Sequence, residues 1–505
     1  EPTSAEIKMF FKEIEKFKTQ YGKLFEATAR IRTLYVDTVN ENKLQEDAII
    51  GMLQKLDPHS TYIPKEEVKE MNEPLVGSFE GIGVQFQMLE DTLFVEQTIS
   101  GGPSEKVGIL PGDRIVFVND SCIAGVKMST PKIMKRLRGK KGTEVAIKVL
   151  RRGNKELIDF KIIRDKIPLF SVDAAYMIAP EIGYIKLNKF SATSKNEFDE
   201  AFDKLQKKGM TSLIFDLQTN GGGYLQTAYQ LADDFLSNKQ MIVYTEGRAD
   251  RMNYVASAKG KFEQGKLIFL VNEYSASASE ILSGAVQDWD RGLIVGRRTY
   301  GKGLVQQPVS LSDGSLIRLT TARYYTPAGR CIQKPYSEGV EKYKQDVVER
   351  YNRGELNNED SIHFPDSLRK ETLILKRTVY GGGGIMPDYF VPLDTSFNSP
   401  YLTKIVAKGV VNEFASKYFE KHKDEMTIAY PNFELYNANF VMPEAGLQEL
   451  IALATAEKIP FSQTEFDKSK QFLKTQLKAL FARRMWDLNA FYQVMNTENE
   501  ACKKA

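Results

Sequence analysis

Hydrophobic and polar positions change their spacing several times along the chain. In residues 1–75 apolar side chains recur every three or four positions, which predicts a helical N-terminal region. Short alternating runs separated by glycines follow, for example at residues 113–118 and 144–150. Alternation of this kind is typical of strands that bury one face, so we predict a compact β-rich domain at residues 76–165.

Strands and helices then alternate through residues 166–397. The apolar runs at residues 212–217 and 267–271 have the length of buried strands, and each precedes a helical pattern. This order is typical of an α/β domain with a largely parallel sheet. Within it, residues 338–368 are charged and weakly periodic, and we expect an exposed insertion there. Residues 398–505 return to helical periodicity, which predicts a C-terminal helical domain.

Composition narrows the classes of partner and cofactor. The 505 residues carry 69 Lys and Arg against 66 Asp and Glu, and this net charge of +3 does not favour a nucleic-acid-binding surface. Three histidines and three cysteines lie far apart in the sequence without metal-ligand spacing. We therefore expect neither a zinc site nor an iron–sulfur centre.

Membrane spans are not expected either, because no stretch approaches the roughly 18 apolar residues that a spanning helix needs. The sequence begins with Glu1 and not with methionine. We therefore expect that a signal peptide or anchor has been removed, and that any membrane association would be through that removed anchor.

A glycine-rich loop is the first candidate for chemistry, since functional loops of an α/β sheet gather at the carboxyl ends of its strands. It reads Gln218-Thr219-Asn220-Gly221-Gly222-Gly223 and lies between a buried run and a helical pattern. Consecutive glycines let backbone N–H groups face a ligand or a developing anion. A flexible strand-to-helix turn explains the same glycines, and the pattern alone does not separate the two interpretations.

The next loop has three alternating serines, Ser275-Ala276-Ser277-Ala278-Ser279, before Glu280. A serine here would lie beside the positive end of the following helix dipole, a position that suits a nucleophile. The stretch from Ser277 to Glu280 also matches a Ser-x-x-Glu capping box, which on pattern alone is the favoured interpretation. The choice among the three serines stays open.

The third loop, residues 296–303, nearly matches the phosphate-binding pattern Gly-x4-Gly-Lys-Ser/Thr. Gly303 lacks the final hydroxyl, and residues 304–309 predict a strand in place of the required helix, so a nucleotide site is not favoured. The loop does contain Lys302. Because histidine is scarce, a lysine is a candidate base for serine hydrolysis, and Ser277 with Lys302 is a plausible pair.

Residues 271–306 as a whole resemble the catalytic segment of the carboxyl-terminal processing peptidases, also called tail-specific proteases. The similarity is carried by the serine-alanine run and by Thr299-Tyr300-Gly301-Lys302-Gly303. In that family a serine, a lysine twenty-five positions later and a glutamine four beyond it form the site. The same spacing here implies Ser277 as nucleophile, Lys302 as general base and Gln306 as the residue that orients the lysine.

The resemblance covers about residues 30–395. It includes an N-terminal motif, Leu56-Asp57-Pro58-His59-Ser60-Thr61-Tyr62, and a closing motif, Gly384-Ile385-Met386-Pro387-Asp388. It implies a multidomain α/β protein: a crotonase- or ClpP-like protease core, an inserted β-rich PDZ domain, and helical N- and C-terminal regions. Within the PDZ domain, a peptide carboxylate would be held by the backbone amides of Ile82, Gly83 and Val84.

Two positions depart from the family pattern. Gly221 replaces a proline that the family often has in the glycine-rich loop, and we expect the same backbone path to remain possible. Tyr274 stands where the family usually has glycine, and we expect it to alter a substrate pocket. The helical region after about Asn398 is not part of the common family core, and the resemblance implies no role for it.

The resemblance implies a serine endopeptidase that recognises apolar C-terminal tails through its PDZ domain and cleaves through an acyl-enzyme. The oxyanion would face the amides of Ala278 and of Gly222 or Gly223. No metal or organic cofactor is implied. The partners would be polypeptides with free apolar C-termini, while a regulatory adaptor and a homo-oligomer are left open. Because the family is usually exported, a bacterial periplasmic or cell-envelope location is implied.

Two other functions compete with proteolysis. A non-catalytic PDZ scaffold would bind peptide tails, would keep this binding after Ser277→Ala, and would cleave nothing. An acyl-transfer enzyme acting on a small substrate is the third hypothesis, because α/β cores with glycine-rich oxyanion loops host many acyl chemistries.

Overall fold

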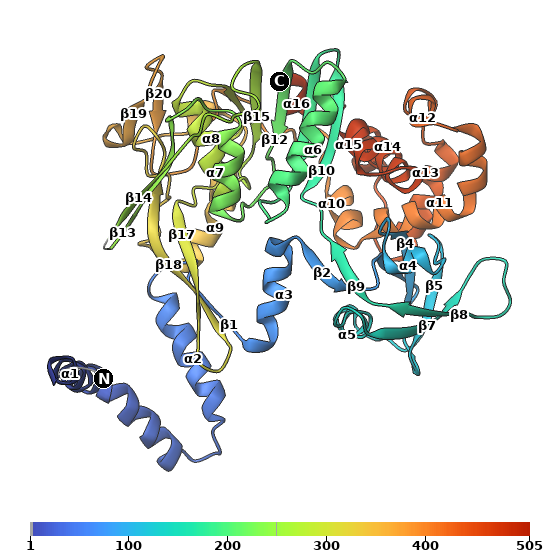
Figure 1. The fold of residues 1–505 in the computed structure, drawn as a ribbon. Helices are drawn as coiled ribbons and strands as arrows, with labels where there is room; N and C mark the ends of the chain where they lie inside the picture. The colour runs from blue at the N-terminus through green and yellow to red at the C-terminus, as the bar shows by residue number, and fades with distance from the viewer. Residues whose placement is uncertain (1–3, 249) are drawn as a thin grey trace. The chain divides into compact units, whose positions relative to one another are not determined.

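The computed structural model describes residues 4–248 and 250–505, with side chains from Thr19 onward (Figure 1). The first three residues of the predicted N-terminal helical region therefore lie outside the described part. The chain divides into two compact units. One contains Glu1–Val68, Gln306–Thr320 and Glu338–Val340, and the other contains Lys69–Val305, Thr321–Ser337 and Glu341–Ala505.

The unit that holds the N-terminus is helical at its start, as predicted. Helix α1 spans Ser4–Leu34, α2 spans Glu41–Gln54 and strand β1 spans Thr61–Ile63. The side chain of Asn40 accepts the N–H of Lys43 and so caps the start of α2. Strand β1 pairs antiparallel with the first residues of β18 (Leu316–Tyr325) within this unit.

The β-rich domain is a small antiparallel sheet closed by short helices. Its strand order is β3-β4-β5-β7-β8, with β6 paired to β5, so β3 lies at an edge. Ile82, Leu93, Ile115 and Ile147 are almost completely buried in its core. The elements of this region are α3 (Lys65–Val76), β2 (Ser78–Gly81), β3 (Val84–Leu89), β4 (Thr92–Thr98), α4 (Pro103–Lys106), β5 (Arg114–Val118), β6 (Ser121–Cys122), α5 (Thr130–Leu137), β7 (Glu144–Leu150), β8 (Ile158–Ile163) and β9 (Asp165–Pro168).

The α/β domain is built on a six-stranded sheet with the order β10-β11-β12-β15-β16-β21. The five strands from β11 onward are parallel, which confirms the prediction, and β10 is antiparallel to β11. Side chains alternate between faces along β12: Leu213 and Phe215 pack with the helices, while Ile214 packs on the opposite face. The elements are β10 (Val172–Ala179), β11 (Ile182–Leu187), α6 (Ser194–Lys207), β12 (Ser212–Asp216), α7 (Leu225–Asp233), β15 (Lys266–Val271), α8 (Ala278–Asp288), β16 (Leu293–Gly296) and β21 (Tyr389–Phe390).

The opposite face of this sheet is covered by the end of the chain (Figure 1). Tyr184 and Leu270 from the sheet share a buried cluster with Ala501 and Cys502 from the last helix. The C-terminal helical domain has its own core as well, and this confirms the predicted helical region. Its helices are α10 (Pro400–Ala407), α11 (Val410–Ala429), α12 (Phe433–Asn439), α13 (Glu444–Ala456), α14 (Gln463–Met485), α15 (Leu488–Met495) and α16 (Glu500–Lys504).

The segment at residues 338–368, which we expect to be an exposed insertion, is mostly exposed or partly exposed but contains a few buried side chains. It forms α9 (Val340–Asn352), and the side chains of Tyr343, Arg350 and Leu356 are buried. A polar side chain, Arg350, is among the few that this segment buries. The remaining strands are β13 (Met241–Gly247), β14 (Arg251–Val255), β17 (Leu304–Ser310), β19 (Arg369–Glu371) and β20 (Thr378–Tyr380).

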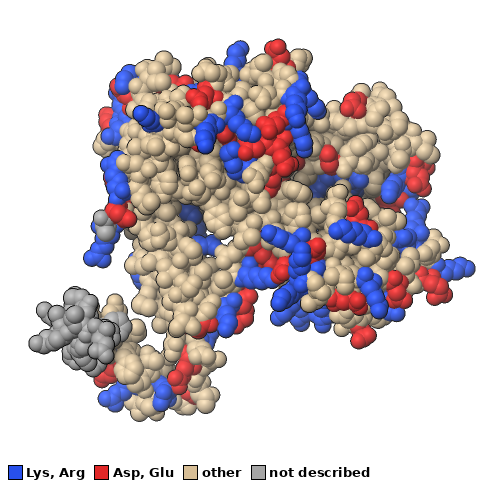
Figure 2. All heavy atoms as spheres, in the orientation of Figure 1, with Lys and Arg blue, Asp and Glu red and all other residues tan. Residues whose placement is uncertain are grey.

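Surface charges of both signs are interspersed on the face shown in Figure 2. Basic and acidic side chains lie beside one another there, in keeping with the near balance of 69 positive and 66 negative residues. Among the described residues, no helix is both long enough and apolar enough to cross a bilayer.

A buried ion pair ties the end of α8 to the turn after β18. The Arg330 guanidinium donates to the Asp288 carboxylate at 2.6 Å, and both side chains are fully buried. Asp288 also accepts the N–H of Ala328 at 2.8 Å. A buried charge whose partner is removed is strongly destabilising, so this pair anchors the turn only while both residues are present.

Replacing Arg330 with methionine should therefore lower the free energy of unfolding by about 3–5 kcal/mol, since the Asp288 carboxylate would be left without its counter-charge. The matched control is Arg251→Met, which removes an exposed arginine paired with Glu246 and should change stability by less than about 1 kcal/mol. Guanidinium unfolding followed by circular dichroism measures both. Equal midpoints for the two variants would contradict the anchoring role.

Candidate functional site

Three loops meet at one edge of the sheet because they follow the adjacent parallel strands β12, β15 and β16. The glycine-rich loop follows β12, the serine loop follows β15, and the loop that contains Lys302 follows β16. Hydrogen bonds join the first two loops directly. The N–H of Ala276 and the hydroxyl of Ser279 both donate to the carbonyl of Asn220, at 3.0 and 2.8 Å.

The three serines have different surroundings, which separates them as nucleophile candidates. Ser275 and Ser279 are fully buried, and their hydroxyls donate to the carbonyls of Leu217 and Asn220. Ser277 is only partly buried and has φ 56° and ψ −110°. Such a conformation is strained for a residue with a side chain, and strained residues cluster at active sites. The geometry therefore favours Ser277 among the three.

Ser277 is also the N-cap residue of helix α8, directly before its first residue, Ala278. The Glu280 carboxylate accepts the Ser277 N–H at 2.7 Å, as in a capping box. Helix α8 is buried along its whole length, so its position is fixed by the core. The cap and the nucleophile, which the sequence presented as alternatives, are compatible in one residue.

The glycine-rich loop passes so close to Ser277 that only glycine fits. A Cβ on Gly222 would lie 2.8 Å from the Ala276 carbonyl oxygen and 2.9 Å from the Ala278 nitrogen. A Cβ on Gly223 would lie 2.1 Å from the Phe190 carbonyl oxygen. Both glycines have positive φ, 98° and 153°. The glycines thus serve close backbone approach, which the flexible-turn interpretation does not require.

The amides of this loop are not equivalent. The N–H of Gly222 donates to the Asn220 side chain at 2.8 Å, whereas the N–H groups of Gly223 and Ala278 have no acceptor within the described part of the chain. An oxyanion site needs uncommitted donors. Of the two glycines that the sequence left open, Gly223 is the better candidate.

Glu280 connects the serine loop to the lysine loop. Its carboxylate is completely buried and accepts four hydrogen bonds. One oxygen accepts the N–H groups of Ser277 and Lys302, at 2.7 and 2.9 Å. The other accepts the N–H of Gly301 at 2.7 Å and the hydroxyl of Thr299 at 2.5 Å. Two residues twenty-five positions apart are therefore held against one oxygen atom.

Burial raises the pKa of Glu280 to about 7, while the four hydrogen bonds act in the opposite direction. Tyr324 adds a second link between the loops, because its buried hydroxyl donates to the Lys302 carbonyl at 2.7 Å and lies 3.1 Å from the Ser277 carbonyl. The backbones of Ser277 and Lys302 are thus held by two buried side chains, Glu280 and Tyr324.

Gln306 lies in β17 and belongs to the other unit of the structure. Within that unit, its side-chain amide donates to the His59 carbonyl. The strand after the lysine loop is present, as expected from the failed phosphate-binding pattern. Among residues 4–248 and 250–505, no group of three or more His, Cys, Asp or Glu side chains is placed to hold a metal ion.

The expected tail-binding loop borders a groove of about 100 Å³ between β3 and α5. Gly83 has φ 75°, and Ile82, Gly83 and Val84 line the groove together with Phe86, Met134 and Leu137. Because β3 is an edge strand, its outer side is open to pairing by an added strand. This is the arrangement that β-augmentation needs.

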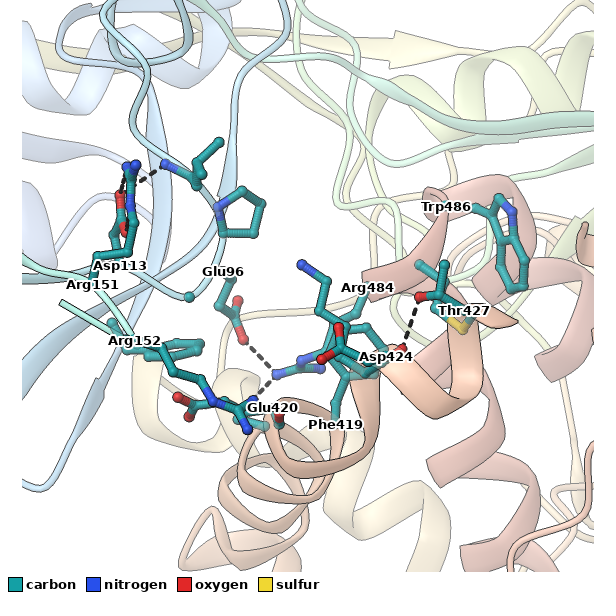
Figure 3. Close-up of a pocket in the computed structure, with 18 of the residues that line it drawn as sticks. Glu96, Asp113, Arg151, Arg152, Phe419, Glu420, Asp424, Thr427, Arg484 and Trp486 are labelled. Atoms are coloured by element: carbon teal, nitrogen blue, oxygen red, sulfur yellow. Dashed lines mark hydrogen bonds and ion pairs between the residues drawn. The ribbon is translucent and has the colours of Figure 1, made fainter. Parts of the chain in front are cut away.

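A larger cavity of about 750 Å³ separates the β-rich domain from the C-terminal helices (Figure 3). Arg484 of α14 reaches across to Glu96 of β4, at 2.7 Å, and Arg152 donates to the Glu420 carbonyl at 2.8 Å. The C-terminal domain also contacts the glycine-rich loop, since Asn499 donates to the Gln218 side chain at 2.9 Å. The C-terminal domain is therefore hydrogen-bonded to both the β-rich domain and the α/β domain.

Several residues of the site were not identified as such from the sequence. The sequence pattern indicates only a capping role for Glu280, and it indicates no role for Tyr324. Tyr274, expected to alter a substrate pocket, is about half exposed. The signal for Glu280 was its position three residues after Ser277, but nothing in the pattern showed that the lysine loop would share it.

Four family models match the chain. They are peptidase family S41 at residues 181–342, the PDZ domain at 81–162, the activating protease CtpB N-terminal domain at 2–67, and a family of unknown function, DUF8443, at 401–487. The β-rich domain is thus a PDZ domain, and the α/β domain is a protease core. The helices after residue 400 match a family to which no function is attached.

Curated relatives agree with the family models. A carboxy-terminal-processing protease of Bartonella bacilliformis is 37% identical over 62% of this chain and 72% of its own length. The carboxy-terminal processing protease CtpB of Bacillus subtilis is 34% identical over 68% and 73%, and CtpA of the same organism is 35% identical over 63% and 67%. The chain therefore belongs to the carboxy-terminal processing serine proteases of peptidase family S41.

Proposed function

We propose that this protease cleaves polypeptides with free apolar C-termini, using Ser277 as nucleophile and Lys302 as general base. The observation that carries the proposal is the single Glu280 oxygen that accepts the N–H groups of both residues. That contact supports a working pair because it places the two backbones side by side. The strained φ of Ser277 and its partial exposure point to the same residue.

The reaction follows from the roles of these groups. The neutral amine of Lys302 takes the proton of the Ser277 hydroxyl as its oxygen bonds to the substrate carbonyl carbon. The resulting ammonium gives this proton to the leaving nitrogen when the C–N bond breaks, and an acyl-enzyme remains. A water molecule, deprotonated by Lys302, then releases the acyl group, and Ser277 recovers its proton. In this proposal Gln306 orients the lysine.

The tetrahedral oxyanion would be held by the N–H groups of Ala278 and Gly223. The N–H of Gly222 already donates to the Asn220 side chain, which supports the choice of Gly223. This hydrogen bond also holds the loop in its conformation. Ala278 is the first residue of α8, so the helix dipole adds to its hydrogen bond. Removing one such donor typically lowers kcat by about 10²–10³-fold.

The PDZ domain would bind the substrate tail along the edge of β3, with the carboxylate at the amides of Ile82, Gly83 and Val84. The open edge of β3 and the groove beside α5 support this mode. A bacterial periplasmic or cell-envelope location is proposed from the family alone. Membership of a protease family argues against a non-catalytic scaffold and against a small acyl substrate, which remain outcomes of the tests below.

Cleavage should depend on Ser277, on Lys302 and on a free tail. An unstructured polypeptide that ends in small apolar residues is incubated with the native chain, with Ser277→Ala and with Lys302→Met, and the products are read by mass spectrometry. We expect cleavage by the native chain alone, reduced about tenfold or more when the substrate C-terminus is amidated. Tail binding without cleavage by any of the three would favour the scaffold, and hydrolysis of a small ester without tail dependence would favour acyl transfer.

Glu280→Gln should lower kcat/KM by about 100-fold or more, because its NH₂ group would face N–H donors that now bind a carboxylate oxygen. Glu200→Gln, at an exposed position of α6, is the matched control and should retain native activity. Peptide hydrolysis is measured after circular dichroism has shown both variants folded. Native kcat/KM in folded Glu280→Gln would contradict the connecting role of this carboxylate.

The tail-binding loop is tested with two glycines of one domain that both have positive φ. In Gly83→Ala the added Cβ would lie 3.0 Å from Cδ1 of Ile167 in β9, whereas a Cβ at Gly101 would have no atom within 4 Å. Fluorescence polarisation with a labelled apolar tail, in the Ser277→Ala background, should show about tenfold weaker binding for Gly83→Ala and a change below about twofold for Gly101→Ala. Equal losses of affinity in the two variants would show that backbone strain alone, and not a change in the groove, weakens tail binding.

A further inference from the structure

The loop that carries Lys302 is held on a second side, away from Glu280, by the segment after β18. The Arg350 guanidinium on α9 donates to two consecutive carbonyls of this loop, Arg298 at 2.6 Å and Thr299 at 3.0 Å. Arg350 and Thr299 are both completely buried. A planar guanidinium that spans adjacent carbonyls fixes the local path of the backbone, because its donors have a rigid geometry.

Neighbouring contacts extend this support along the loop. The N–H of Lys334 donates to the Gly301 carbonyl at 3.0 Å. The Lys334 ammonium lies 3.8 Å from the centre of the Tyr300 ring and pairs with Asp346 of α9 at 2.9 Å. Every residue from Arg298 to Gly301 therefore has a contact with α9 or with the chain that leads into it.

We infer that α9 acts as an intramolecular strap for the catalytic-lysine loop and that Arg350 is its positioning residue. This inference rests on the proposed role of Lys302. Arg350 acts three residues away from Lys302 and through the backbone, while Glu280 holds the same stretch from the side of α8. The lysine loop is thus clamped between two buried charged groups from distant parts of the sequence.

The strap matters for rate because a lysine base must lie within hydrogen-bond reach of the serine hydroxyl. A displacement of about 1 Å in such a group can lower the rate by about 10²-fold. The groove proposed to bind the substrate tail is lined by residues of the PDZ domain and by none of this loop. Loss of the strap should therefore lower kcat and leave KM and tail affinity close to native.

The charge arrangement makes the test practicable. Glu355, the acidic partner of Arg350, also pairs with Arg298 at 2.5 Å and with Arg353 at 2.9 Å. Replacing Arg350 by methionine therefore removes a buried positive charge without leaving Glu355 unpaired. We expect Arg350→Met to fold, with the carbonyls of Arg298 and Thr299 deprived of their donor.

The experiment compares the native chain, Arg350→Met, Arg350→Lys and the matched control Lys344→Met, which removes an exposed lysine of the same helix. Steady-state cleavage of the apolar-tailed polypeptide is normalised to active sites by titration with a fluorophosphonate, and folding is checked by thermal unfolding. Arg350→Met should lower kcat per site by about tenfold or more with KM within about twofold. Arg350→Lys should recover part of this loss, and Lys344→Met should equal the native chain.

Folded Arg350→Met with native kcat per site would overturn the inference. If Arg350→Met does not fold, Arg350→Lys decides, since it keeps the positive charge but has one donor nitrogen in place of the two that bind the carbonyls. A reduced kcat with native KM supports the strap, and a native kcat overturns it. A change in KM alone would also overturn it. A native chain that neither cleaves nor reacts at Ser277 would instead overturn the proposed function, and the strap inference with it.

Discussion

A carboxylate that is completely buried must be satisfied by hydrogen-bond donors, and Glu280 meets this requirement with groups from two separate loops. Since the four donors cannot reach it unless the serine and lysine loops are in place, the buried charge and the site geometry depend on each other. Arg350 extends the same principle, because its buried guanidinium is satisfied by carbonyls of the lysine loop. Folding the core therefore positions the proposed catalytic pair.

The order of strands in the sheet explains why these loops meet. The C-terminal domain connects the site to the PDZ domain within the larger unit. Parallel strands in the order β12, β15, β16 bring the three loops to one edge. Helices α15 and α16 cover the far face of the same sheet, and Asn499 contacts Gln218 at the start of the glycine-rich loop. Through Arg484 and Glu96 the same domain is bonded to the PDZ domain.

The sequence predicts the fold classes well because local patterns determine them. Alternation marked the PDZ strands, and apolar runs followed by helical patterns marked the parallel sheet. The family motif selected Ser277 and Lys302 by spacing. From the residues alone the serine could not be distinguished from its neighbours, because the difference is one of backbone conformation and burial: Ser275 and Ser279 donate to buried carbonyls.

Long-range polar contacts could not be predicted from the sequence pattern. Arg350 contacts a loop about fifty residues earlier in the chain, and its side chain is buried although most of its segment is not. The hydrogen bond from the Gly222 N–H to the Asn220 side chain depends on the path of one loop. Such features follow from tertiary structure, because a polar side chain gives the same sequence signal whether it is solvated or buried with partners.

The most direct test of the central claim is to map the serine that a fluorophosphonate modifies. The native chain and Lys302→Met are labelled, digested and analysed by tandem mass spectrometry. The account predicts a single modified serine, Ser277, in the native chain and little or no label in folded Lys302→Met. Modification of another serine, or equal labelling of Ser277 in the two proteins, would contradict it.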